Sequence, residues 1–261
     1  MNKLLKKICI KKKKELNIIK SKCSMSSLIK LLPTKNNRGF KKLLEKSQKK
    51  KINNIIKEIK KSSPSAGEII KNYYPDHIAT QYEKSGVGAI SILTEKNFFQ
   101  GDIEHLSLIN RSSNLPILRK DFIIDSYQVY ESKVFNADAI LLIVSILNDK
   151  EIKKFIKIST EIGLDCIVET HSLEELQRAL KIGHPIIGIN NRNLDNLSIN
   201  INNTIDLIKK IPSDFTIIAE SGIKKKEDIK LYNSHNIYNF LIGETILKSE
   251  NIDGKIKELL S

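Results

Sequence analysis

An alternation of short apolar runs with helical segments is the feature that most constrains how this chain of 261 residues can fold. From residue 54 onward, β-branched apolar runs of strand length are each followed by a stretch with apolar residues at i, i+3 and i+4. The predicted strands are Ile55–Lys60, Ala89–Leu93, Ile117–Lys120, Ala139–Val144, Cys166–Glu169, Ile186–Asn190, Thr216–Glu220 and Phe240–Gly243. Eight strand-then-helix units in about 200 residues predict an α/β fold, the (β/α)8 TIM barrel. A doubly wound open sheet is the alternative, although it rarely needs eight regular units.

The segment ahead of the first strand, Leu4–Gln48, has helix-like apolar spacing with breaks at Pro33 and Gly39. We therefore expect residues 1–48 to form an N-terminal helical extension packed on a catalytic barrel of residues 49–261. The apolar side chains expected to cover the barrel and part of the active-site mouth are Leu4, Leu5, Ile8, Leu16 and Ile19. Farther along the chain, Ser172 is predicted to cap a helix that stops at Gly183.

The net charge of +14 is unevenly distributed. Residues 1–57 carry 19 basic and 2 acidic residues, whereas residues 58–261 carry 25 basic and 28 acidic ones. Only 5 of the 44 cations are Arg, the side chain best suited to base and phosphate recognition. We expect the run Lys11–Lys14 to lie on a solvated helix face and the protein to bind no nucleic acid. A basic nucleic-acid-binding protein stays open as an alternative, which steep salt dependence of heparin or DNA binding would favour.

Neither a membrane span nor a metal centre is expected. The longest apolar stretch, Ala139–Leu147, is too short to cross a bilayer, and the first 20 residues do not resemble a secretory signal. Cys9, Cys23 and Cys166 are far apart and have no His at ligand spacing, which argues against structural zinc and for a reducing compartment. The sequence thus predicts a cytoplasmic protein without membrane contact.

Polar residues follow most of the predicted strands. Because the chemistry of such barrels takes place at the carboxyl ends of the strands, these residues are the candidate site. They are Glu58, Lys60, Lys120, Glu169, Asn190, Arg192, Glu220, Ser221, Gly222, Gly243 and Glu244. The last two strand ends, Glu220-Ser221-Gly222 and Gly243-Glu244-Thr245, occupy the position where barrels commonly bind a phosphate. Glu244 does not suit that role unless its carboxylate turns away from the phosphate.

Several motifs resemble a known enzyme family. They are Glu58-Ile59-Lys60-Lys61-Ser62-Ser63-Pro64-Ser65, Leu93-Thr94-Glu95, Phe99-Gln100-Gly101, Leu118-Arg119-Lys120-Asp121-Phe122, Gly188-Ile189-Asn190-Asn191-Arg192-Asn193-Leu194, Glu220-Ser221-Gly222-Ile223 and Phe240-Leu241-Ile242-Gly243. In this order, over nearly the whole chain, they resemble the indole-3-glycerol-phosphate synthases of tryptophan biosynthesis. The resemblance implies a single-barrel enzyme that closes the indole ring of 1-(2-carboxyphenylamino)-1-deoxyribulose 5-phosphate with loss of carbon dioxide and water.

The resemblance also implies the role of each site residue. Lys120 would be the general acid and Glu169 the base, with Lys60 at the anthranilate carboxylate and Glu58 and Glu220 orienting the ammonium groups. Asn190 and Arg192 would lie near the sugar hydroxyls. The phosphate pocket would comprise Ser63, Ser221, Gly222, Gly243 and Glu244, and the apolar wall Phe99, Phe122 and Leu118. No metal and no organic cofactor are expected, and the protein would act on its small phosphosugar as a monomer.

Two further points stay open at this stage. Another phosphosugar barrel, such as an isomerase of a related ribulose compound, is a rival within the fold, but it would not explain two strand-end lysines together with Ser63-Pro64-Ser65. The five His residues look incidental, and only His171, which closely follows Glu169, merits attention.

Overall fold

Eight parallel strands close into a barrel in the order β1-β10-β9-β8-β7-β6-β5-β4 in a computed structural model that describes residues 3–34, 37–64, 66–193, 197–247, 249 and 251–261. The strands are β1 (Asn54–Ile59), β4 (Ala89–Leu93), β5 (Ile117–Lys120), β6 (Ala139–Ile143), β7 (Asp165–Thr170), β8 (Ile186–Asn190), β9 (Thr216–Glu220) and β10 (Asn239–Ile242). All eight predicted strands are confirmed to within one residue at each end. Because β1 pairs with both β10 and β4, the ring is closed and the open sheet is excluded.

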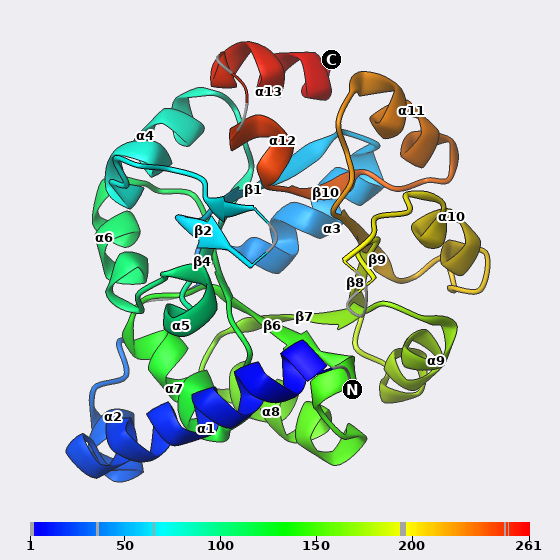
Figure 1. The fold of residues 1–261 in the computed structure, drawn as a ribbon. Helices are drawn as coiled ribbons and strands as arrows, with labels where there is room; N and C mark the ends of the chain where they lie inside the picture. The colour runs from blue at the N-terminus through cyan, green and yellow to red at the C-terminus, as the bar shows by residue number, and fades with distance from the viewer. Residues whose placement is uncertain (1–2, 35–36, 65, 194–196, 248, 250) are drawn as a thin grey trace.

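Helices surround the strands, as Figure 1 shows. They are α4 (Pro75–Lys84), α6 (Glu104–Ser112), α7 (Ser126–Val134), α8 (Asp149–Glu161), α9 (Leu173–Ile182), α10 (Asn202–Ile208), α11 (Lys226–Ser234) and α13 (Ile252–Leu260). Shorter elements lie in the loops: the hairpin β2 (Ser62–Ser63) and β3 (Gly67–Glu68), the helices α5 (Lys96–Phe99) and α12 (Glu244–Leu247), and the 3-10 turn η1 (Val144–Ile146). The predicted ends of α9 are confirmed, with Ser172 accepting a hydrogen bond from the N–H of Glu175 and Gly183 following the last turn.

Two apolar layers form the core. One lies between the strands and the helices and includes Ile55, Ile90 and Ile140. The other fills the inside of the barrel and includes Ile56, Leu118 and Leu141. This alternation follows from the strand period of two, and it places Glu58 on the same inner face as Ile56.

The N-terminal helices α1 (Lys3–Lys22), α2 (Met25–Lys30) and α3 (Phe40–Lys50) reach both ends of the barrel. Phe40 and Leu44 of α3 join the inner apolar layer, and the carbonyl of Leu44 accepts a hydrogen bond at 3.1 Å from Asn239, the first residue of β10. Helix α3 therefore closes the amino end of the barrel. Helix α1 lies at the opposite end, in contact with α5 (Figure 1). The ammonium group of Lys12 on α1 forms an ion pair with Asp121, the residue that follows β5.

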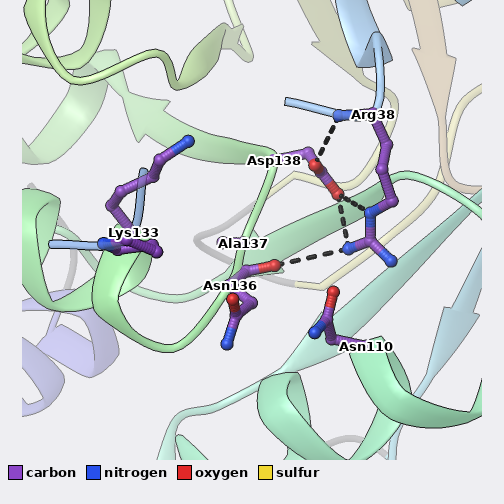
Figure 2. A pocket seen from close by; sticks show the side chains of 7 residues that line it. Arg38, Asn110, Lys133, Asn136, Ala137 and Asp138 are labelled. Atoms are coloured by element: carbon purple, nitrogen blue, oxygen red, sulfur yellow. Dashed lines mark hydrogen bonds and ion pairs between the residues drawn. The ribbon is translucent and has the colours of Figure 1, made fainter. Parts of the chain in front are cut away.

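A buried ion pair fixes the chain just before α3 (Figure 2). Arg38 donates from Nε to Asp138 Oδ2 and from its backbone N–H to Asp138 Oδ1, both at 2.8 Å. Its Nη2 also donates to the carbonyl of Asn136 at 3.3 Å. Because Asp138 immediately precedes β6, this pair holds the extension at the amino end of the barrel.

The prediction that Lys11–Lys14 lie on a solvated face is wrong for one of the four. Lys11, Lys13 and Lys14 are exposed, but the side chain of Lys12 is only 4% exposed and lies 3.1 Å from Asp121 Oδ1. The helical repeat explains the difference, since Lys12 lies on the same buried face of α1 as Leu5, Ile8 and Leu16. In the part of the chain that the structure describes, no helix has the length and apolarity needed to cross a membrane.

Candidate active site

A cavity of about 620 Å³ opens at the carboxyl end of the barrel, a size in the usual range for small-ligand sites. It brings together nearly all residues that the sequence predicted for the site. Those that line it are Glu58, Lys60, Ser63, Phe99, Lys120, Phe122, Glu169, Asn190, Arg192, Glu220, Ser221, Gly222 and Gly243. Glu244 begins α12, but its side chain lies outside the described part of the structure.

Lys120 lies at the centre of the charged groups. Its Nζ is 3.2 Å from Glu169 Oε2 and 3.0 Å from Glu220 Oε2, so the last residue of β5 meets carboxylates from β7 and β9. Burial alone would lower the pKa of Lys120, but the charges of Glu169, Glu220 and Glu58 outweigh it and hold the pKa above its usual range. The ammonium group is therefore charged at neutral pH.

The two carboxylates beside Lys120 differ. Burial, together with the charge of Glu169, raises the pKa of Glu220 to about 8 despite the nearby Lys120. The pKa of Glu169 is instead held well below its usual range, because Lys120 and His171 outweigh the effect of burial. At neutral pH Glu169 is thus ionised, while Glu220 carries a proton much of the time.

A second pair, Glu58 and Lys60, lies on β1 and directly after it. The Lys60 ammonium contacts Glu58 Oε1, and this cation, with Lys120, lowers the pKa of Glu58 even though burial opposes it. Gly243 allows the arrangement, since a Cβ at that position would lie 2.2 Å from Glu58 Oε1. On the outer face of β1, the fully buried Lys57 donates to the carbonyl of Gly243 at 2.9 Å, which fixes this loop from behind.

The loop after β9 turns sharply beside the cavity. Ser221 and Gly222 have φ of 64° and 89°, and a Cβ on Gly222 would lie 2.6 Å from a methyl group of Ile199. Asn191 stabilises the turn, since its amide donates to the carbonyls of Glu220 at 3.1 Å and Ser221 at 3.0 Å. The second Asn of the Asn190-Asn191-Arg192 motif is therefore buried, and it shapes the loop from outside the cavity.

Asn190 and Arg192 lie together at the end of β8. The backbone N–H of Arg192 donates to Asn190 Oδ1 at 3.0 Å, and both residues line the cavity. Lys224 and Lys255 also line it, although no signal in the sequence singled them out.

Part of the cavity lining is apolar. The rings of Phe99 and Phe122 lie 6.2 Å apart, and Phe99 is positioned by Glu95, which accepts from the N–H groups of the first turn of α5. Leu4, Leu5 and Ile8 of α1 line the cavity, as do Leu93, Leu141 and Ile143 of the barrel. The assignment of Leu118 to the wall is wrong, because its side chain points into the inner core and is fully buried there.

His171, the one histidine that merited attention, contacts the site. Its Nε2 is 3.1 Å from Glu169 Oε1. Within the described residues, no group of three His, Cys, Asp or Glu side chains is arranged to hold a metal ion.

Comparison with known proteins gives one consistent family. The family described as indole-3-glycerol phosphate synthase matches residues 5–259 of the chain. Relatives named indole-3-glycerol phosphate synthase include one from Legionella pneumophila (strain Paris), 42% identical over 100% of both chains. Another, from Thermoanaerobacter pseudethanolicus, is 46% identical over 98% of this chain and 97% of its own. A third, from Acetivibrio thermocellus, is 49% identical over 78% of each.

Solved structures with a similar fold have low sequence identity to this chain, so they support the assignment of the fold alone. The KGPDC of Streptococcus mutans superposes with a TM-score of 0.60 at 16% identity, covering 80% of this chain and 96% of that one. A thiamine phosphate pyrophosphorylase from Pyrococcus furiosus gives a TM-score of 0.57 at 14% identity, covering 80% and 94%.

Proposed function

Because this chain belongs to the indole-3-glycerol phosphate synthase family, we propose that its cavity carries out that family's reaction with Lys120 as general acid and Glu169 as base. The substrate is 1-(2-carboxyphenylamino)-1-deoxyribulose 5-phosphate, and the products are indole-3-glycerol phosphate, carbon dioxide and water. The observation that carries this assignment of roles is the contact of Lys120 with both Glu169 and Glu220 in a cavity that is also lined by apolar side chains.

Ring closure needs a cation at the ketone of the substrate. An aromatic carbon attacks the carbonyl carbon, and negative charge develops on the carbonyl oxygen, where an ammonium group stabilises it and then donates a proton. Lys120 is charged at neutral pH and its carboxylate neighbours orient it, so it suits this step. Loss of carbon dioxide then leaves a ring that still carries the hydroxyl formed from the ketone.

The last step removes water and forms the double bond of the indole. A base must take the remaining ring proton, and a cation must assist the departing hydroxyl. Glu169 is the ionised carboxylate of the pair beside Lys120, which supports its assignment as the base. Glu220 and Glu58 would orient Lys120 and Lys60.

The substrate has an aromatic ring with a carboxylate at one end and a phosphate at the other, and the cavity is lined by apolar as well as charged side chains. The aromatic ring would lie among Phe99, Phe122 and the α1 side chains, with its carboxylate at Lys60. The phosphate would lie at Ser63, Ser221, Gly222 and Gly243, to which we add Glu244 on the resemblance alone. Asn190 and Arg192 would bind the sugar hydroxyls between these ends.

The proposal extends to the organisation of the chain. Residues 1–48 would be an extension of the barrel of residues 49–261, and the protein a cytoplasmic monomer that binds neither nucleic acid nor membrane. The burial of Lys12 in the contact with Asp121 supports a packing role for the basic segment. The three unpaired cysteines are in keeping with a reducing compartment.

The test is direct. The protein is incubated with the carboxyphenylaminodeoxyribulose phosphate and the indole product is followed by fluorescence. Lys120→Ala should lower kcat by about 10²–10⁴-fold and change KM little, because the substrate anchors lie elsewhere. The control is Lys13→Ala, which removes an exposed ammonium. An inactive wild-type protein would overturn the function, and a Lys120→Ala rate within about tenfold of wild type would overturn the role of Lys120.

A further inference from the structure

His171 directly follows β7 and lies between two carboxylates. Its Nε2 is 3.1 Å from Glu169 Oε1, and its Nδ1 is 3.2 Å from Glu175 Oε2 on α9. The backbone N–H of His171 donates to the same Glu175 oxygen at 2.8 Å. The side chain is only 8% exposed, so the imidazole lies in a largely dry position with a carboxylate near each nitrogen.

The two carboxylates that share Lys120 have different neighbours. Glu169 and Glu220 each place one oxygen against the Lys120 ammonium. The other oxygen of Glu169 faces His171, whereas the other oxygen of Glu220 is buried without a hydrogen-bond partner among the described residues. Two buried carboxylates close together do not both ionise readily, so an additional cation beside one of them decides which holds the charge.

We propose that His171 is a positioning residue that keeps Glu169, and not Glu220, as the ionised carboxylate beside Lys120, with Glu175 holding the imidazole in place. This inference rests on the proposed function, since it assigns the means by which the base is kept ready. His171 itself transfers no proton. Its imidazolium stays paired with Glu169 Oε1 by charge, and Oε2 remains to take the proton from the substrate once Lys120 turns to the substrate oxygen.

The charge of His171 sets a pH range for this effect. Burial alone would lower the pKa of the imidazole, but the hydrogen bonds and charges of Glu169 and Glu175 outweigh it and raise the pKa to about 9. Among the described residues, the charged groups that face the ring are these two carboxylates, with Lys120 and Glu220 beyond Glu169. The side chain of Asn203 on α10 lies by the His171 carbonyl and is uncharged. The cation is therefore present at neutral pH and is lost as the pH rises through about 9.

The first test measures the imidazole directly. The protein is labelled with isotopically enriched histidine, its five histidines are titrated by NMR, and the His171 signal is identified by its absence from His171→Gln. We expect a His171 pKa near 9 in the wild type. In Glu175→Gln it should fall by about one unit or more, because one neighbouring anion is lost. The control is His184→Gln, which removes a histidine bonded to the carbonyl of Cys166 at the other end of β7.

The second test follows the reaction in single turnovers across pH 6–10. His171→Gln should lower the rate by about 10- to 100-fold with KM within about threefold, as expected when a catalytic group is poorly positioned. The rate of His171→Gln relative to wild type should be lowest below about pH 8, where Glu169 and Glu220 share one proton, and should recover at higher pH, where both carboxylates are ionised. Glu175→Gln should show the same pH dependence with a smaller loss.

The two failures are distinguishable. A wild-type protein that makes no indole overturns the proposed function, while the NMR titration still reports the charge of His171. A His171 pKa at or below 7, or an unchanged pH profile in both variants of an active enzyme, overturns the inference. Melting temperatures of all variants are compared. If His171→Gln does not fold, Glu175→Gln decides between the outcomes, because it keeps the histidine and removes only the neighbouring charge.

Discussion

Replacing Lys12 with methionine removes one charge from α1 and keeps a side chain of similar length. In the wild type the Lys12 ammonium is 3.1 Å from Asp121 Oδ1, and Asp121 directly follows Lys120. The same helix carries Leu5 and Ile8 over the cavity. The substitution should therefore lower both the stability of the fold and the affinity for substrate.

The size of the stability loss depends on the hydrogen bonds that Asp121 retains after Lys12 is replaced. Removing one partner of a buried ion pair typically costs about 3–5 kcal/mol, because the other charge is left buried and unpaired. Asp121 still accepts hydrogen bonds from Arg119 at 2.9 Å, Thr94 at 2.7 Å and the N–H of Phe122 at 2.8 Å. We therefore expect a smaller loss of about 1–3 kcal/mol. In a protein of this size that lowers Tm by about 3–9 °C.

The assay is urea unfolding at several pH values, with KM measured on the same samples. Burial alone would raise the pKa of Asp121, but Lys12 and Arg119 outweigh it and hold the pKa well below its usual range. Because Asp121 stays ionised, its contribution is lost only in strong acid, and the loss caused by Lys12→Met should be constant between pH 5 and 8.

Lys13→Met is the control, since it removes a neighbouring but exposed charge. Equal stability of Lys12→Met and Lys13→Met, with equal KM values, would refute the anchoring role of Lys12.

Three further predictions test other parts of the structure. Glu169→Gln should let an intermediate accumulate that has lost carbon dioxide but not water, detectable by mass; unchanged turnover would assign the base to another group. Deleting residues 1–34 should lower Tm and impair turnover, since it removes buried side chains worth about 1.5–3 kcal/mol each; an unchanged Tm with loss of heparin binding alone would instead favour the polyanion alternative. Burial lowers the pKa of Lys57 to about 7, so above that pH the unfolded chain binds the additional proton and Lys57 makes the free energy of unfolding rise with pH. His171 and Glu220, whose pKa values are raised, act in the opposite sense in this range, so the comparison with Lys57→Met isolates the effect of Lys57. In urea unfolding the stability of the wild type relative to Lys57→Met should rise from pH 7 to 9, and a constant difference would contradict the assignment.

The barrel could be predicted from the sequence because its signal is local. Each strand is a short β-branched run and each helix has its own apolar period, so the eight units are visible without knowledge of contacts. The strand-end rule then placed Lys120, Glu169 and Glu220 at one mouth, and the cavity contains all three.

The features that could not be predicted from the sequence depend on contacts between residues that are far apart in the chain. Lys12 looks like its exposed neighbours, and only the fold brings it to Asp121, 109 residues away. Leu118 lies next to Arg119 and Lys120 in a site motif, yet it is fully buried in the inner layer and does not line the cavity. The unequal charges of Glu169 and Glu220 likewise need the position of His171, since both are simply Glu at a strand end.

The charge distribution has a structural reason once the extension is in place. Within the described residues, the basic first fifth of the chain forms ion pairs with three aspartates of the barrel: Lys12 with Asp121, Lys20 with Asp125 and Arg38 with Asp138. Two of these aspartates follow β5 at the carboxyl end, and Asp138 precedes β6 at the amino end. The N-terminal segment therefore covers the cavity with α1 and closes the amino end of the barrel with α3. A barrel without the N-terminal extension would expose apolar surface at both ends. The positive charges of the extension that pair with these aspartates therefore serve to attach it to the barrel. The exposed lysines remain to contact other molecules.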